Sequence, residues 1–600
     1  MPSAHFVATP GQSSPSFPNQ NPFRFRGLLQ HLLPMQRVRD LYNRAQQPVN
    51  RSLMENILSE MEVKYEITNA DLTRIPKEGP VVVVANHPFG ILDGAILGAL
   101  LTRVRPDVKI ITNYLLSGIS ELHEHCIFVD PFGSPESVTA NRRALRKAIE
   151  WLRGGGMLAM FPAGEVSHFQ LREMEVADSQ WNTTVARLIS MTDVPALPMF
   201  FRGRNSVPFQ TMGLVHPQLR TAWLFNEFLQ QKGWKVEVRT GSLISADSIR
   251  KARSPQEAAR YLRWRTYLLA QRGTSHWQVP PALKSVLPSR RQEAIAETVP
   301  QRALVQDIEQ LPPAQCLDEN REYAVYIAEA HQAPSLMQEI GRLREITFRA
   351  AGEGSGRASD LDRFDSYYKH VLLWSKENQE LVGAYRLGLT DQILPLKGID
   401  GLYTNTLFRY DCQLFDRFGP ALELGRSFVR PEYQRQYTPL LMLWKGIGRF
   451  LTQHPEIAIL FGAVSVSSRY NRVSRELIVR YFQSLEDGGG IASLVTPRRP
   501  FRLRSKASAD CGNVADIHDL PIADVESDRK GVPILLKHYA KLGGRILSFN
   551  VDRQFSDVLD GLVFVDLRRT SPAVLERYMG RAGVQAFHQF HLKSFYLVPA

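Results

Sequence analysis

The chain has 600 residues, of which 44% are hydrophobic and 22% are charged, and its formal net charge is +13. This balance is typical of globular proteins and excludes a disordered or collagen-like chain. At roughly 150 residues per domain, the length predicts several domains or two large ones. The four cysteines lie far apart and form no CxxC pair. That pattern excludes a disulfide scaffold and a zinc-ribbon site, and it is typical of a reducing compartment.

Residues 1–50 are predicted to form a mobile tail and then a basic amphipathic segment, in which Leu28/Leu29 and Leu32/Leu33 share one helical face. Such a helix can lie at the headgroup level of a membrane; the alternative is a helix that docks on its own domain. The sequence has neither a bilayer-spanning apolar stretch nor a signal peptide. We therefore expect a cytoplasmic protein, peripheral on the inner face of the cytoplasmic membrane. Nucleic acid is not an expected partner, because no nucleic-acid-binding motif accompanies the positive charge.

Short apolar runs alternate with helical patterns in the range 51–270, which is predicted to be one domain. Strands are predicted there at 81–85, 108–112, 126–129 and 157–161, and helices at 93–101 and 139–153. A proline-containing linker with some short helix is predicted within 271–318, and a second domain over 319–600. Its strands are expected at 323–328, 381–387, 421–429 and 457–466, and its helices at 335–347 and 440–451. Strands that alternate with helices indicate the α/β fold class.

A first group of candidate catalytic residues follows the strand predicted at 81–85. It comprises His87 and Asp93, in the sequence Asn-His-Pro-Phe-Gly-Ile-Leu-Asp. A histidine at the carboxyl end of such a strand occupies the usual site position of α/β folds. Asp93 can accept a hydrogen bond from one ring nitrogen and leave the other as a base. The attacking hydroxyl would then come from the substrate. The alternative is a satisfied histidine in a turn, with Asp93 as a helix cap.

Two further blocks lie downstream, Phe-Pro-Ala-Gly-Glu-Val-Ser at 161–167 and Val-Pro-Ala-Leu-Pro-Met at 194–199. In this order, the three blocks resemble those of the glycerolipid acyltransferase family, over about residues 50 to 245. The resemblance implies that His87 is the general base, that Asp93 orients it, and that an acyl thioester is attacked. It also implies that Gly164, Glu165 and Ser167 contact the acceptor.

The sequence departs from that family at two places. Five residues, rather than four, separate His87 from Asp93, and the extra one can be absorbed before the helix begins. Ala163 stands in place of the family's glutamate, and Val166 stands where an arginine is often found. Because arginine is the natural fork for phosphate oxygens, its absence favours an acceptor without phosphate. Glu165 would suit an ammonium-bearing acceptor; alternatively, it is a structural acid of the loop.

A second group of residues is spread over the C-terminal half. It comprises Arg344, Phe348, Asp362, Asp365, Arg386, Glu423 and Arg426. The segments that carry these residues, taken in chain order, resemble the branch of the Gcn5-related N-acyltransferases that uses acyl-carrier protein. Within that branch they most resemble the ornithine N-acyltransferases, and the resemblance covers roughly residues 320 to 580. For an amine acceptor, Glu423 is the candidate general base, directly or through water. Asp362 and Asp365 could hold a cationic amino acid, and Arg386 and Arg426 its carboxylate. The alternative is an internal ion-pair lattice that positions the strands.

The residues at 434–439, Gln-Arg-Gln-Tyr-Thr-Pro, lack the glycines that a backbone cradle for the pyrophosphate of coenzyme A needs. This favours acyl-carrier protein as thioester donor, and the sequence predicts no metal site and no other cofactor. Together the two halves resemble the bifunctional ornithine lipid synthases. That resemblance implies N-acylation of ornithine with a 3-hydroxyacyl group, and then O-acylation of the lyso-lipid. Two alternatives stay open: a single O-acyltransferase with a non-catalytic C-terminal domain, and a non-catalytic membrane scaffold for acyl-carrier protein.

Overall fold

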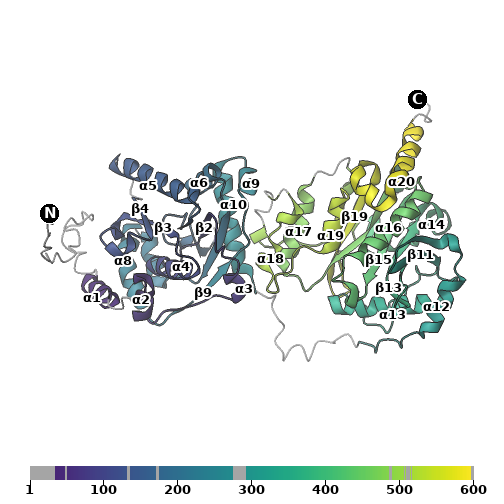
Figure 1. The fold of residues 1–600 in the computed structure, drawn as a ribbon, viewed down its shortest axis with the longest axis horizontal. Helices are drawn as coiled ribbons and strands as arrows, with labels where there is room; N and C mark the ends of the chain where they lie inside the picture. Colours follow the sequence, from purple (N-terminus) through teal and green to yellow (C-terminus); the bar gives the residue numbers. More distant parts are fainter. Residues whose placement is uncertain are drawn as a thin grey trace, which may run out of the picture. The chain divides into compact units, whose positions relative to one another are not determined.

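The structure is a computed structural model that describes residues 34–46, 51–130, 135–170, 174–215, 217–273, 292–411, 413–485, 490–505, 507–508, 514 and 516–595. The chain divides into two compact units, each with its own central sheet (Figure 1). Unit 1 comprises Met1–Thr274 together with the remote segment Ala523–Arg529. Unit 2 comprises Ser275–Ile522 and Lys530–Ala600.

The sheet of unit 1 has seven strands in the order β1-β9-β8-β2-β5-β3-β4. Their bounds are β1 Lys64–Glu66, β2 Val81–Ala85, β3 Val108–Asn113, β4 Cys126–Val129, β5 Met157–Met160, β8 Ala196–Arg202 and β9 Lys235–Thr240. All neighbouring strands are parallel except β8 and β9. The central strand β2 is four valines and an alanine, all fully buried, as a strand covered on both faces requires.

Helices cover both faces of this sheet. On one face, α4 (Ile91–Val104) and α2 (Leu53–Glu60) pack over Val81, Val83 and Ala85. α5 (Pro135–Arg153) contacts β5, and α10 (Pro255–Leu268) contacts β2 and β8. The remaining helices of unit 1 are α3 Asn69–Leu72, α6 Thr184–Thr192, α7 Val207–Val215, α8 Pro217–Gln230 and α9 Ala246–Arg250. The predicted α/β class is thereby confirmed for the N-terminal half.

Helix α1 (Met35–Ala45) docks on its own unit. Leu41, Tyr42 and Ala45 are buried in the core shared with α2 and α4. The four leucines at 28, 29, 32 and 33, on which the membrane-surface prediction depends, lie outside the described residues. For α1 itself, the packing corresponds to the alternative of a docked helix, and its arginines are exposed.

The sheet of unit 2 has eight strands in the order β10-β11-β12-β13-β15-β16-β19-β18, and only β15 and β16 pair in parallel. Their bounds are β10 Cys316–Glu319, β11 Tyr323–Glu329, β12 Lys369–Ser375, β13 Glu380–Leu389, β15 Ala421–Val429, β16 Ile459–Val466, β18 Arg545–Asp552 and β19 Val558–Asp566. The main helices are α12 Gln301–Gln310, α13 Pro334–Ala351, α14 Thr390–Lys397, α15 Gln413–Phe418, α16 Thr438–Gln453, α17 Arg472–Ser484, α19 Ile534–Lys541 and α20 Pro572–Phe595. Helix α18 (Ile522–Val525) lies almost wholly in the segment Ala523–Arg529 of unit 1.

The range 271–318, predicted as a linker with some short helix, contains helix α12 and most of strand β10 among its described residues. Helix α12 buries Leu304 against α13, and β10 is the edge strand of the sheet. Apolar side chains in this range therefore join the core of unit 2 in spite of the prolines around them.

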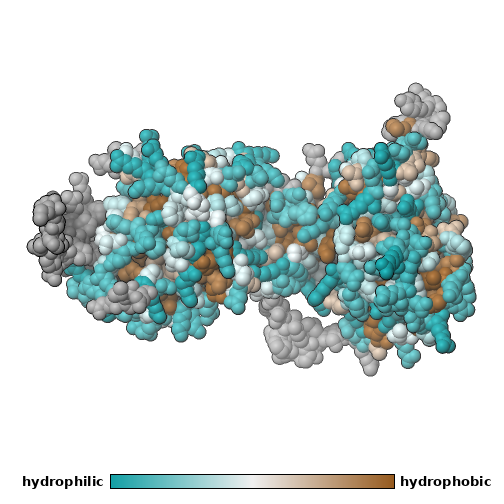
Figure 2. Space-filling model, in the orientation of Figure 1, coloured by the Kyte–Doolittle hydropathy of each residue, from teal (hydrophilic) through white to brown (hydrophobic). Residues whose placement is uncertain are grey.

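Among the helices of the described ranges, none combines the length and the apolar character needed to cross a membrane. On the face drawn in Figure 2, hydrophilic residues predominate and apolar residues are scattered among them.

Candidate active sites

The imidazole of His87 lies at the carboxyl end of β2 and faces the carboxylate of Asp93. The His87 Nδ1 is 3.0 Å from the Asp93 Oδ2, and the ring stacks on Phe161 with centroids 4.1 Å apart. Because Asp93 engages Nδ1, Nε2 is the nitrogen that can take a proton from a substrate. The side chain of His87 is 18% exposed, whereas that of Asp93 is fully buried. Solvent therefore reaches this pair only from the imidazole side, and its geometry is the one that a general base and an orienting carboxylate require.

The extra residue between His87 and Asp93 is absorbed before helix α4 begins. Gly90 adopts φ +83°, and Asp93 is the third residue of the helix. The Asp93 Oδ2 also accepts the backbone N–H groups of Phe89 at 2.8 Å and of Gly90 at 2.9 Å. Burial raises the pKa of Asp93, while His87 and these backbone groups oppose the rise. The carboxylate thus caps the helix and holds the imidazole at the same time, so the two interpretations of Asp93 are compatible.

Asp178, which the sequence analysis missed, holds the loop that carries His87. Its Oδ1 accepts the backbone N–H of His87 at 3.1 Å and the hydroxyl of Ser167, and its Oδ2 accepts the Trp181 indole N–H at 2.9 Å. The hydroxyl of Tyr267, on α10, accepts the N–H of Asp178 at 2.7 Å. No local motif marks Asp178, because its partners come from three separate segments.

The loop at 161–167 places its predicted acceptor-binding residues in different surroundings. Gly164 adopts φ +71° in the turn, where its lack of a side chain matters. The Glu165 carboxylate accepts the hydroxyl of Ser179. Ser167 is buried, and its N–H donates to the His87 carbonyl at 2.8 Å. In this geometry Ser167 supports the backbone of His87, and Gly164 and Glu165 lie in the adjoining turn.

In unit 2, five of the predicted residues come together as an ion-pair lattice. Arg386 on β13 donates to Asp362 at 2.6 Å and to Asp365 at 3.1 Å. Arg344 on α13 donates to Asp365 at 2.8 Å. Arg426 on β15 lies 3.6 Å from Asp362 and 3.4 Å from Asp360, a residue that the sequence analysis missed. The arginines thus already occupy both carboxylates that were predicted to hold a cationic substrate.

The geometry of Arg426 depends on a local irregularity in β15. The register between β13 and β15 shifts between Ala384 and Arg386, and Arg426 has φ +48°. A non-glycine residue in this region is strained, and the ion pairs with Asp360 and Asp362 hold it there. Its guanidinium also lies over the ring of Tyr403, 4.9 Å from the centroid.

Glu423 lies beside this lattice and is 1% exposed. Its carboxylate accepts the backbone N–H of Thr404 at 2.7 Å, the N–H of Tyr403 at 3.3 Å and the hydroxyl of Tyr368. Burial raises its pKa, and these hydrogen bonds and Arg386 oppose the rise. The hydroxyl of Tyr368 is thus a side-chain group that contacts the Glu423 carboxylate. Phe348 packs against the apolar cluster beneath α13 rather than in the lattice.

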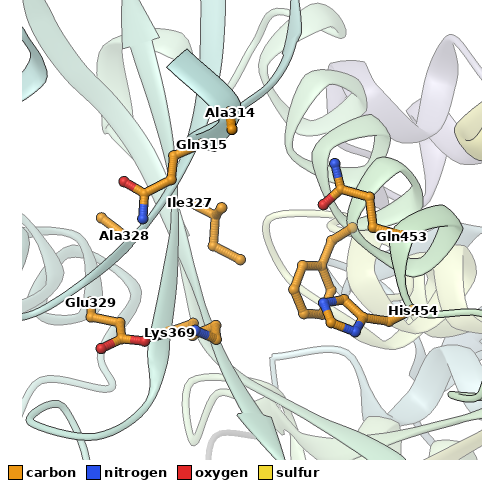
Figure 3. A pocket seen from close by; sticks show the side chains of 9 residues that line it. Ala314, Gln315, Ile327, Ala328, Glu329, Lys369, Gln453 and His454 are labelled. Carbon is orange, nitrogen blue, oxygen red and sulfur yellow. Dashed lines mark hydrogen bonds and ion pairs between the residues drawn. The ribbon is translucent and has the colours of Figure 1, made fainter. Parts of the chain in front are cut away.

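A hollow of about 190 Å³ in unit 2 involves none of the predicted site residues. It is lined by β11, the start of β12 and the end of α16, with Glu329, Lys369 and His454 on its walls (Figure 3). Among the described residues, no group of His, Cys, Asp and Glu could hold a metal ion.

The two halves match two known families. The family described as Acyltransferase matches residues 45–274, and the acetyltransferase (GNAT) domain matches residues 343–445. The chain is therefore an enzyme that transfers acyl groups, with an acyltransferase domain in its N-terminal half and a GNAT domain in its C-terminal half.

More specific relatives are found among characterised proteins. The chain is 32% identical over 257 residues to the glycine N(alpha)-acyltransferase of Bacteroides thetaiotaomicron, a match that covers 39% of this chain and 74% of that protein. The chain belongs to the family of that N-acyltransferase. It is also 25% identical over 249 residues to the lyso-glycine lipid O-acyltransferase of Phocaeicola vulgatus. This second match covers 40% of this chain and 86% of that protein.

Two other relatives are more limited. The L-ornithine N(alpha)-acyltransferase of Brucella abortus is 31% identical over 154 residues, which are 24% of this chain and 50% of that protein. The solved structure of the 1-acyl-sn-glycerophosphate acyltransferase of Thermotoga maritima is 21% identical, with coverage of 38% of this chain and 84% of that one. Its TM-score is 0.23, so this likeness supports no statement about the site.

Proposed function

We propose that the chain makes a diacylated aminolipid in two consecutive steps. Unit 2 N-acylates the α-amine of ornithine with a 3-hydroxyacyl group, and unit 1 then O-acylates the hydroxyl of that product. Relatives named for N-acylation of an amino acid and for O-acylation of a lyso-aminolipid support this pairing. The observation that carries the O-acylation step is the 3.0 Å contact between His87 and Asp93.

In the proposed O-acylation, the His87 Nε2 takes the proton of the lipid hydroxyl as its oxygen attacks the thioester carbonyl. The carbon–sulfur bond then breaks, and the thiolate recovers the proton from the imidazolium. Asp93 holds the ring and stabilises the transient imidazolium charge. The loop of unit 1 that would meet the acceptor has Val166 where an arginine could bind phosphate, which favours a lyso-aminolipid.

In the proposed N-acylation, the neutral α-amine attacks the thioester, and its surplus proton passes to Glu423 by way of Tyr368. The carbon–sulfur bond then breaks, and Glu423 returns that proton through Tyr368 to the leaving thiolate, so the amide and the thiol are the products. Acyl-carrier protein is the proposed donor, since residues 434–439 lack glycines and the chain has a net charge of +13 that favours an acidic partner. No metal or further cofactor enters either step of the proposal.

We also propose that the protein works at the inner face of the cytoplasmic membrane, where its amphiphilic intermediate resides. Exposed arginines on α1 support this, because basic side chains are attracted to anionic headgroups.

The experiment is expression of the whole chain in a host without aminolipids, followed by mass spectrometry of its lipids. N-acyl ornithine together with its O-acylated form is the expected result. A purified chain, supplied with the same acyl group on acyl-carrier protein or on coenzyme A, then identifies the donor. Formation of only an O-acylated product would favour the single-activity alternative, and no new lipid would overturn the proposal.

A further inference from the structure

Two carboxylates that the mechanism does not use meet on one face of the unit 2 sheet. On β19, Asp560 lies directly opposite Ser465 of β16 and Asn550 of β18. Residues in directly opposite register point to the same face. The hydroxyl of Ser465 donates to the Glu353 carboxylate at 2.7 Å. Asp560 and Glu353 therefore converge on Ser465.

Ser465 and the two carboxylates lie beyond the point at which the parallel strands β15 and β16 stop pairing. β15 and β16 pair only between Ala421–Glu423 and Ile459–Phe461, although both strands continue beyond these residues. Ser465 on β16 and Arg426 on β15 both lie past the last paired residues. The acidic group is thus on the same stretch of the sheet as the lattice around Arg426.

Asp560 is a buried carboxylate with an unsatisfied oxygen. It is 5% exposed, and its Oδ2 is buried without a hydrogen-bond partner in the described part of the chain. Burial raises the pKa of Asp560 well above its ordinary range; Asp552 and Glu353 raise it further, and the charge of Arg426 opposes them. Burial also raises the pKa of Glu353. An unpaired buried carboxylate is costly, and a bound cation would remove that cost.

Aromatic rings connect this acidic group to the lattice. The Arg426 guanidinium lies 4.3 Å from the centroid of Phe555, in the connection between β18 and β19, and 4.9 Å from that of Tyr403. Arg426 therefore adjoins the acids of β18 and β19 on one side and pairs with Asp360 and Asp362. Arg426 is thus a positive group next to the acidic group of the two carboxylates. A dibasic amino acid has the matching charges, because it carries a carboxylate at one end and a distal ammonium group at the other.

We propose that Asp560 and Glu353 bind the side-chain ammonium group of a dibasic amino-acid acceptor, of the ornithine or lysine class. This inference rests on the proposed function, in which unit 2 acylates the α-amine. It adds the selection of the acceptor, which the relatives leave divided between glycine and ornithine. Glycine has no group to satisfy Asp560, and a site with an unpaired buried polar group discriminates against such a ligand.

The test measures N-acylation by the full chain with three acceptors: ornithine, norvaline and glycine. Norvaline has the carbon chain of ornithine without the ammonium group. The wild-type chain is expected to prefer ornithine, and Asp560→Asn to raise the KM for ornithine about tenfold to a hundredfold. Its KM for norvaline and glycine, which have no side-chain ammonium group, should change less than its KM for ornithine. Glu353→Gln, at a half-buried position, should shift the preference in the same direction.

Asp557→Asn provides the matched control. Asp557 is exposed in the same β18–β19 connection, and its φ of +55° suits asparagine, so the preference for ornithine should persist. An ornithine-to-norvaline ratio unaffected by Asp560→Asn and Glu353→Gln would overturn the inference and leave the proposed function standing. A wild-type preference for glycine would overturn the inference and, with it, the choice of ornithine as acceptor in the proposed function, while N-acylation of an amino acid would stand. A wild-type chain that acylates none of the three would instead overturn the proposed function.

Discussion

Arg265 and Asp524 form a buried ion pair in unit 1, although 259 positions separate them in the chain. The Arg265 Nη2 lies 3.2 Å from the Asp524 Oδ2, and the Arg74 Nη1 lies 2.7 Å from its Oδ1. Ser242 donates to the same carboxylate from its N–H and its hydroxyl, both at 2.8 Å. A fragment ending at residue 300 would leave these arginines without their carboxylate. Point variants of the full chain therefore separate the two activities better than truncation does.

We expect Asp524→Asn to lower the free energy of unfolding of unit 1 by about 3 kcal/mol, because it leaves buried arginines without a counter-charge. Burial alone would raise the pKa of Asp524, but Arg265 and Arg74 outweigh it and the pKa lies below its ordinary value. Such a carboxylate stabilises the fold above the unfolded-state pKa, and its contribution is lost as the pH falls through the folded-state pKa. The difference between wild type and variant in thermal unfolding should therefore shrink in acid.

Asp247→Asn is the control for this measurement. Asp247 pairs with Arg250 on the surface, where its side chain is 78% exposed. Exposed pairs contribute about 1 kcal/mol or less, so the control should unfold nearly as the wild type does. Equal effects of the two substitutions would contradict the assigned role of Asp524.

We expect Asp178→Asn to lower the kcat of O-acylation about tenfold to a hundredfold while N-acylation is retained. Asp178 accepts the backbone N–H of His87 and the hydroxyl of Ser167, so the variant loosens the loop that places the imidazole. The measurement is the rate of each step with its own acceptor. An equal loss in both steps would indicate general misfolding rather than positioning.

We expect Glu423→Gln to lower the kcat of N-acylation by about 10²- to 10⁴-fold, since glutamine accepts no proton. Burial raises the pKa of Glu423, so the wild-type rate should fall as the pH drops through a value above the ordinary carboxyl range. This acid limb should disappear in the variant, and Tyr368→Phe should weaken N-acylation as well. A variant that is less stable but keeps the acid limb would assign Glu423 to the ion-pair lattice alone.

We expect replacement of Arg37 and Arg39 by glutamine to weaken binding to vesicles that contain anionic lipid, by about 1 kcal/mol per charge. Both arginines are exposed on α1, whose other face is buried. The same double change at Arg142 and Arg143, exposed on α5, is the control of equal charge. Cosedimentation at low and high salt provides the measurement. Equal losses in both variants would attribute binding to net charge instead of to α1.

Local sequence patterns predict the part of the candidate O-acylation site that lies between strand β2 and the start of helix α4. The valine run Val81–Ala85 predicts β2 with the bounds that the structure has, and the position of His87 at its end follows from it. The contact with Asp93 was predictable because both residues flank one turn. The same holds for β15, whose predicted range 421–429 contains Glu423 and Arg426.

Contacts between distant segments were not predictable from such patterns. Asp178 and Asp524 carry no motif, and their partners become neighbours only when the sheet and α10 have formed. Asp362 was predicted beside a substrate cation, but Arg386 lies 2.6 Å from it. The local sequence around such an aspartate is the same whether its carboxylate binds a substrate or pairs with an arginine. The outcome depends on whether an arginine of another strand reaches the carboxylate in the folded chain.

The most direct test of the central claim is the lipid content of a host that expresses the full chain with His87→Ala. Removing the imidazole that Asp93 holds at 3.0 Å eliminates the proposed base for the lipid hydroxyl but leaves unit 2 intact. We predict that N-acyl amino acid accumulates while its O-acylated form falls by at least about 10²-fold. Wild-type amounts of the O-acylated lipid from the His87→Ala chain would contradict the account.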